Sequence, residues 1–266
     1  MSRITVATLK KLKQSGEKFA CLTTYDAIFA QVLETAGVEV LLVGDSLGMV
    51  IQGHDSTLPV TTDDIIYHTR AVRRGSSRAL IMADMTFMSY STEHQAVENA
   101  GRMLKEGGAH IVKLEGGDAF IPIVEKLTNH GIPVCGHLGL QPQSVNKMGG
   151  YRIQGKDAQS AEIILRDAKA LEKAGCDLML LECVPLELAR KVTESLQIPV
   201  IGIGAGPYCD GQVLVLQDML GITPGKRPRF TRDFLAGSQS VAAAVESYVQ
   251  AVKSGTFPSL EESFTS

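Results

Sequence analysis

Residues 38–45 read Val-Glu-Val-Leu-Leu-Val-Gly-Asp, a short and almost continuous apolar run that ends in glycine and a carboxylate. A run of this length and composition predicts a β-strand buried on both faces, as strands in parallel sheets are. Helical periodicity precedes the run at residues 27–36 and follows it at residues 62–74. Because parallel strands need crossover connections, this alternation predicts a repeating strand–helix unit.

The same kind of run recurs seven more times, at residues 19–26, 79–84, 111–115, 134–140, 178–183, 200–206 and 213–216. Further helices are expected between these runs, at residues 92–106, 119–129, 157–174 and 186–196. The limits of the last run are the least defined, because polar residues flank it. Eight repeats without a visible second domain favour an α/β fold, a single (β/α)8 TIM barrel over residues 1–266, rather than an open doubly wound sheet.

The two ends of the chain are expected to lie outside these repeats. Residues 1–16 combine four basic residues with an apolar stripe, which predicts a short amphipathic helix at the bottom of the barrel rather than a transit peptide. A helical extension is expected at the C-terminus. The Ser- and Pro-containing tail after Gly255 is expected to be a surface or partner-contacting extension.

The overall composition is that of an ordinary globular protein, with 44% hydrophobic and 21% charged residues. A formal net charge of −3 argues against nucleic acid or an anionic membrane as the main partner. No apolar run reaches the roughly 18 residues needed to cross a bilayer. The five cysteines lack CxxC spacing, so buried free thiols and a reducing, cytoplasmic compartment are expected.

Polar side chains stand at the ends of several predicted strands, and barrel closure brings such ends to one mouth. They are Asp45 and Ser46, Asp84, Lys113 with Glu115, His137, and Glu182. A single carboxylate after a strand is usually a helix N-cap. Four of them around one mouth repel each other unless a cation lies among them, and their oxygens suit Mg²⁺. One Mg²⁺ ion per subunit is therefore predicted.

Seven segments carry a resemblance to a known family: residues 42–49, 52–60, 113–117, 134–140, 181–185, 201–206 and 210–212. On these segments the chain resembles the ketopantoate hydroxymethyltransferases, in order from about residue 9 to the C-terminal tail. The long segment after the second strand, which includes Gly44-Asp45-Ser46 and Gly53-His54-Asp55, is the most specific.

The resemblance implies transfer of a hydroxymethyl group from 5,10-methylenetetrahydrofolate to 3-methyl-2-oxobutanoate (α-ketoisovalerate). The product is ketopantoate, on the route to pantothenate and coenzyme A. These small molecules are the expected partners. The resemblance also implies a homo-oligomer, with a decamer as the expected assembly.

The resemblance further assigns roles to the residues at the predicted mouth. Asp45, Asp84 and Glu115 belong to the Mg²⁺ site, and whether Glu115 touches the ion directly or through water stays open. Asp45, Asp84, Ser46 and Lys113 contact the keto acid, and Glu182 acts in acid–base catalysis. The residue chemistry fits these roles, since Mg²⁺ and Lys113 stabilise an enolate after Glu182 removes the C3 proton. His137 is either a substrate-binding residue or a satisfied core histidine.

Two other functions compete with this hypothesis. The first is a Mg²⁺-dependent lyase of the phosphoenolpyruvate mutase and isocitrate lyase type, acting on a 2-oxo acid. Such an enzyme is expected to carry a reactive Lys-x-Cys-Gly-His loop, of which Cys135-Gly136-His137 is a partial match inside a predicted strand. The second is a barrel that binds a ligand or metal without catalysis.

Overall fold

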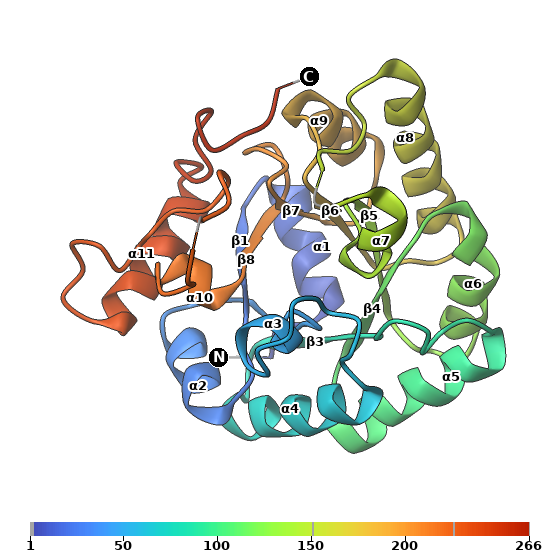
Figure 1. Cartoon of the computed structure of the whole chain (residues 1–266), viewed down its shortest axis with the longest axis horizontal. Coiled ribbons are helices and arrows are strands. Elements are labelled where there is room, and N and C mark those ends of the chain that lie inside the picture. The colour runs from blue at the N-terminus through green and yellow to red at the C-terminus, as the bar shows by residue number, and fades with distance from the viewer. Residues whose placement is uncertain (1–2, 151, 226, 266) are drawn as a thin grey trace.

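The computed structural model describes residues 3–150, 152–225 and 227–265. Its eight parallel strands close into one barrel in sequence order, which confirms the predicted TIM barrel (Figure 1). The strands are β1 (Phe19–Thr23), β2 (Val40–Val43), β3 (Leu80–Asp84), β4 (Ile111–Glu115), β5 (Val134–Gly139), β6 (Leu178–Glu182), β7 (Val200–Ile203) and β8 (Gly211–Leu214). Nearly all of their residues are buried, as expected for strands covered on both faces.

The eighth strand begins two residues before the predicted run at 213–216. Gly211 and Gln212 pair with Ile201 and Gly202 of β7, so the polar Gln212 is part of the barrel. The hydroxyl of Tyr248 donates to the Gln212 carbonyl at 2.9 Å. Glycine and glutamine are not apolar strand formers, so the apolar pattern did not include them and the predicted start of β8 is wrong.

Over the described ranges, seven long helices surround the barrel (Figure 1): α2 (Ala27–Thr35), α4 (Thr62–Gly75), α5 (Glu93–Arg102), α6 (Ile121–Asn129), α8 (Ala158–Lys173), α9 (Leu186–Ser195) and α11 (Val241–Lys253). The shorter ones are α3 (Leu47–Val50), α7 (Val145–Met148), α10 (Leu216–Met219), the π-helical turn η1 (Met103–Gly107), and the 3₁₀ turns η2 (Asp118–Phe120) and η3 (Pro142–Ser144). In the described residues, no helix is long and apolar enough to span a membrane. All five cysteines are buried free thiols, as predicted.

The predicted N-terminal helix is α1 (Val6–Ser15), and it closes the bottom of the barrel. Leu9 is fully buried in a core cluster with inward-facing strand residues such as Phe19, Cys21 and Val40. At the same end, Lys13 pairs with Asp210 at 2.9 Å. Because this end is sealed, the opposite mouth is the accessible end of the barrel.

The C-terminal part of the chain packs on its own barrel. The predicted helical extension is α11, whose Tyr248 hydroxyl donates to the Cys21 carbonyl of β1 at 3.0 Å. The tail after Gly255, expected as a surface or partner-contacting extension, turns back along its own chain. Ser263 is fully buried, and the Leu186 backbone N donates to the Phe264 carbonyl at 2.9 Å. The buried Ser263 and the hydrogen bond between Leu186 and Phe264 hold the tail beside the barrel mouth.

Glu34, at the end of α2, accepts several hydrogen bonds from the loop before β3. Its Oε2 accepts from the Arg78 backbone N at 2.7 Å and from the Ala79 backbone N at 2.8 Å. Partial burial alone would raise the pKa of Glu34, but hydrogen bonds from Ser76 and from the backbone of Ala79, Arg78 and Ser77 outweigh it and lower the pKa to about 2.

A Glu34→Gln substitution should lower the free energy of unfolding by about 1–3 kcal/mol at neutral pH, because the loop amides lose a charged acceptor. A depressed folded-state pKa means that the stabilisation is complete above the usual value of 4.5 and is lost as the pH falls toward about 2. Urea unfolding at pH 7 and pH 3 measures the difference, with Glu98→Gln on the exposed face of α5 as the control. Equal stability of the two variants at pH 7 would contradict the assignment.

Candidate active site

A pocket of about 700 Å³ opens at the carboxyl ends of the strands. Its lining includes every residue that the sequence singled out: Asp45, Ser46, Asp84, Lys113, Glu115, His137 and Glu182. Apolar side chains complete the floor, among them Leu42, Leu180, Ile203 and Val213. The structure therefore brings all the predicted site residues to one cavity with mixed polar and apolar walls.

Strand register explains this convergence. Asp84 pairs with Lys113 across β3 and β4, and Glu115 pairs with His137 across β4 and β5. Residues two apart on a strand face the same side, so Lys113 and Glu115 both point into the barrel. Gly139 pairs with Glu182 of β6 and has φ +92°, and a Cβ there would lie 2.2 Å from the Glu182 carbonyl. Glycine is thus required beside Glu182.

Asp84 and Lys113 form a buried ion pair, with Lys113 Nζ 3.0 Å from Asp84 Oδ1. The Asp45 backbone N donates to the other oxygen, Asp84 Oδ2, at 3.0 Å. Burial alone would lower the pKa of Lys113, but the carboxylates of Asp84, Glu115 and Asp45 outweigh it and raise the pKa. The lysine is therefore a fixed positive charge at the floor of the pocket.

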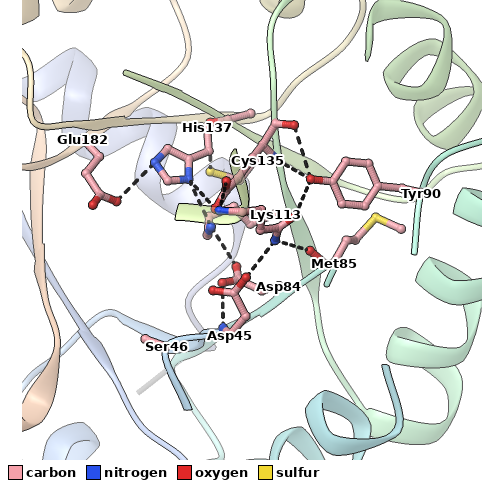
Figure 2. A network of polar contacts seen from close by, with 12 residues as sticks. Asp45, Ser46, Asp84, Met85, Tyr90, Lys113, Cys135, His137 and Glu182 are labelled. Carbon is pink, nitrogen blue, oxygen red and sulfur yellow. Dashed lines mark hydrogen bonds and ion pairs between the residues drawn. The ribbon is translucent and has the colours of Figure 1, made fainter. Parts of the chain in front are cut away.

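His137 lies between two carboxylates, as Figure 2 shows for its contact with Glu182. Its Nε2 is 3.3 Å from Glu182 Oε2, and its Nδ1 is 3.6 Å from Glu115 Oε1 and 3.3 Å from Lys113 Nζ. Burial and Lys113 lower the pKa of His137, but Glu115 and Glu182 outweigh them and raise it. Because the ammonium faces Nδ1, Nε2 carries a proton toward Glu182 in either charge state.

Glu182 differs from the other carboxylates in its exposure. Its side chain is 16% exposed and reaches the pocket from β6. The next residue, Cys183, adopts φ +48°, an uncommon value for a residue with a Cβ. Its backbone N donates to the Ile203 carbonyl and its carbonyl accepts from the Gln154 backbone N, both at 2.9 Å. The turn that carries Glu182 is thus held in a strained conformation, as turns at functional sites often are.

Ser46 is held by a tyrosine. The hydroxyl of Tyr25 lies 2.8 Å from Ser46 Oγ, and the Tyr25 carbonyl lies 2.7 Å from His68 Nδ1. Burial is the main cause that raises the pKa of Tyr25, so its hydroxyl stays neutral. Ser46 is half-buried and faces the pocket with a fixed orientation.

Sequence reasoning missed two buried polar residues at the same floor. Gln143 of η3 donates to Asp45 Oδ2 through Nε2 at 2.8 Å and to Glu115 Oε2 through its backbone N at 3.0 Å. The Tyr90 hydroxyl donates to Gln143 Oε1 at 2.6 Å. Both residues come from irregular segments, where no strand-end pattern marks them.

The carboxylates fit a divalent cation of the Mg²⁺ type. Burial, together with the charges of Asp84 and Glu115, raises the pKa of Asp45 well above its usual range, and a nearby cation would reverse this. Glu115 Oε1 is buried without a hydrogen-bond partner. In the described parts of the chain, no three His, Cys, Asp or Glu side chains enclose an ion by themselves. Carboxylate oxygens of this kind suit Mg²⁺, an ion that keeps several waters.

The outer half of the pocket has a different character. Arg152, Arg227 and Arg229 line it together with the aromatic side chains of Phe230 and Phe264. The two phenylalanine rings lie 6.2 Å apart in an edge-to-face arrangement. The cavity thus continues from a carboxylate-rich floor to a cationic and aromatic mouth, with room for more than one small molecule.

Solved structures with similar folds include phosphoenolpyruvate phosphomutase from Streptomyces platensis, with a TM-score of 0.61 over 82% of this chain and 83% of that one. Another is 2,3-dimethylmalate lyase, with a TM-score of 0.58 over 83% of this chain and 82% of that one. Their sequences are 14% and 15% identical to this chain. At such low identity the similarity supports the barrel fold alone.

Sequence relatives are much closer. The 3-methyl-2-oxobutanoate hydroxymethyltransferase of Nitrosococcus oceani is 60% identical over 264 residues, covering 99% of this chain and all of that protein (100%). A protein of the same name from Hahella chejuensis, designated number 2, is 59% identical over 98% of each chain. The sequence pattern of the ketopantoate hydroxymethyltransferases matches residues 3–260. The chain therefore belongs to the ketopantoate hydroxymethyltransferase family.

Proposed function

We propose that this protein transfers a hydroxymethyl group from 5,10-methylenetetrahydrofolate to 3-methyl-2-oxobutanoate, giving ketopantoate for pantothenate and coenzyme A synthesis. The observation that carries the proposal is one pocket in which a buried lysine, three buried carboxylates and the more exposed Glu182 lie together with apolar side chains. The names of relatives up to 60% identical support the same reaction. The proposal treats residues 1–266 as one catalytic domain.

The floor of the pocket suits a branched 2-oxo acid. Lys113 Nζ and Ser46 Oγ offer a positive charge and a hydroxyl to the keto and carboxylate oxygens. Leu42, Ile203 and Val213 line the same cavity and suit the apolar isopropyl group. Binding between these walls fixes the C3–H bond in one direction, which an enzyme needs before it can remove that proton.

Asp45 and Asp84 would hold Mg²⁺, with Glu115 reaching the ion directly or through water. When bound, the ion would withdraw electrons from the keto oxygen and so acidify the C3–H bond. The buried ammonium of Lys113 adds positive charge beside the same oxygens. The negative charge that develops on the substrate is thus met by groups that are already in place.

Glu182 is the proposed base. It comes from β6, on the far side of His137 from Lys113, so it can face the substrate carbon rather than the ion. Removal of the C3 proton leaves an electron pair that forms the new bond to the folate-borne methylene carbon. The two bonds from that carbon to the folate nitrogens break, and water supplies the hydroxyl of the transferred group. The nitrogens take up the C3 proton and one proton of the water, and tetrahydrofolate leaves.

The outer half of the pocket is the proposed place for the folate. Phe230 and Phe264 suit a flat aromatic ring, and Arg152, Arg227 and Arg229 suit anionic carboxylates. The proposal includes the cytoplasmic homo-oligomer, a decamer, that the family resemblance implies. Exposed apolar side chains such as Tyr67, Met88 and Leu260 are surfaces available for contacts between copies.

The test is hydrogen–deuterium exchange at C3 of α-ketoisovalerate, followed by NMR in D₂O. The proposal predicts exchange that requires Mg²⁺ and needs no folate, and ketopantoate formation when methylenetetrahydrofolate is added. Incubation with the keto acid alone is the control. If the pure protein with Mg²⁺ gave no exchange and no product, that result would contradict the proposal.

The lyase alternative has less support. Cys135, which would stand at the reactive position of its loop, is fully buried in β5. Burial is the main cause that raises the pKa of the Cys135 thiol well above its usual value, which is the opposite of an activated nucleophile. Cleavage of 2,3-dimethylmalate or rearrangement of phosphonopyruvate, measured with the same protein, would revive that alternative.

A further inference from the structure

A buried glutamine contacts two carboxylates at the floor of the pocket, one through its side-chain amide and one through its backbone N, and the proton transfer proposed above does not use it. Gln143 is 5% exposed and lies in η3, after β5. Its side chain donates to Asp45 Oδ2 and its backbone N donates to Glu115 Oε2, at 2.8 and 3.0 Å. One residue therefore holds an oxygen of the carboxylate after β2 and an oxygen of the carboxylate at the end of β4.

The contacts of the amide allow only one orientation. Nε2 also donates to the Met85 carbonyl at 2.9 Å, and Oε1 accepts from the Tyr90 hydroxyl at 2.6 Å. Figure 2 shows Tyr90 and Met85 on the side of Lys113 away from Glu182. A rotated amide would place Oε1 against the oxygens of Asp45 and Met85, which are all acceptors. The Tyr90 hydroxyl thus sets the orientation of Gln143.

This arrangement matters because it fixes one oxygen of each carboxylate: Asp45 Oδ2 by the Gln143 side chain and Glu115 Oε2 by the Gln143 backbone N. Gln143 occupies Glu115 Oε2 and leaves Oε1, which is buried, makes no hydrogen bond and faces His137 Nδ1 at 3.6 Å. The clamp therefore leaves one Glu115 oxygen for an ion or for a water bound to it.

We propose that Gln143, oriented by Tyr90, is a positioning residue for the divalent cation, because it fixes the directions of the Asp45 and Glu115 carboxylates. The inference rests on the proposed function, to which the cation belongs. It adds two residues outside the strand-end pattern to the machinery of the site. Loss of partners of metal-ligating groups typically weakens metal binding about 10- to 100-fold.

The test is calorimetric titration of Mn²⁺ into the full-length protein without substrate. Gln143→Met keeps the bulk of the side chain and removes all of its side-chain hydrogen bonds, so its Kd should rise about 10- to 100-fold. Tyr90→Phe keeps the Gln143 amide and removes only the tyrosine hydroxyl that orients it, so the Kd of this variant for Mn²⁺ should rise less. Raised Mg²⁺ should restore turnover in both variants.

Gln212→Met is the matched control. Gln212 is also a buried amide, 2% exposed, and donates to the Gly206 carbonyl at 3.0 Å, but it does not line the pocket. The Gln212→Met substitution should lower Tm as Gln143→Met does, and it should leave the Kd for Mn²⁺ unchanged. If Gln143→Met binds Mn²⁺ with the wild-type Kd, the role of Gln143 is overturned while the proposed function is not. If Gln143→Met does not fold, a wild-type Kd for Mn²⁺ in Tyr90→Phe overturns the role of Gln143. Wild-type protein that binds no Mn²⁺ overturns the metal assignment as well.

Discussion

Glu182→Gln protein should bind α-ketoisovalerate and Mg²⁺ with affinities close to those of the wild type, while kcat falls by about 10²- to 10⁴-fold, the usual contribution of a general base. The amide has the same shape as the carboxylate, and its oxygen can still accept from His137 Nε2, 3.3 Å away in the wild type. It cannot take a proton from carbon. Catalysis should therefore be lost without loss of the pocket.

The measurement pairs C3 deuterium exchange by NMR with calorimetric binding of the keto acid. Glu194→Gln is the matched control, because its side chain is 67% exposed on α9 and lies outside the pocket. Its exchange rate should equal that of the wild type. Normal exchange in Glu182→Gln would remove this residue from the proton transfer. Lost binding together with lost exchange would instead make Glu182 a substrate-binding residue.

The strand ends were the predictable part of this site. Buried parallel strands read as apolar runs, so the polar residues that close them, such as Asp84 and Glu182, stand out from the sequence. Barrel geometry then brings those ends together without further information. Glu182 and His137 come from different strands and lie 3.3 Å apart for that reason.

The support around these residues was not predictable in the same way. Gln143 and Tyr90 lie in segments without strand periodicity, and their directions depend on contacts across the barrel. The tail after Gly255 was predicted as a surface or partner-contacting extension, and its Ser- and Pro-containing composition did not indicate that it packs on its own barrel. Burial of Phe257 and Ser263 against the chain's own barrel is a tertiary effect that local composition does not report.

Lys113→Met should be the most destabilising single substitution in the site. Lys113 is 4% exposed, and its Nζ is the cation that faces Asp84 at 3.0 Å. Without it, three buried carboxylates lose their common positive partner. Removing one member of a buried pair costs about 3–5 kcal/mol, which for a chain of this size lowers Tm on the order of 10 °C.

Two further measurements separate this electrostatic cause from lost packing. Mg²⁺ should raise the Tm of Lys113→Met more than that of the wild type, because the ion supplies the missing positive charge. Burial raises the pKa values of Asp45 and Asp84 in the folded state, so protonation at lower pH should shrink the stability difference. Lys10→Met, which removes a half-exposed pair with Asp177 at 3.2 Å, should cost only about 0–1 kcal/mol. If Lys113→Met loses little folding stability, or if neither Mg²⁺ nor pH alters that loss, this lysine does not hold the carboxylates together.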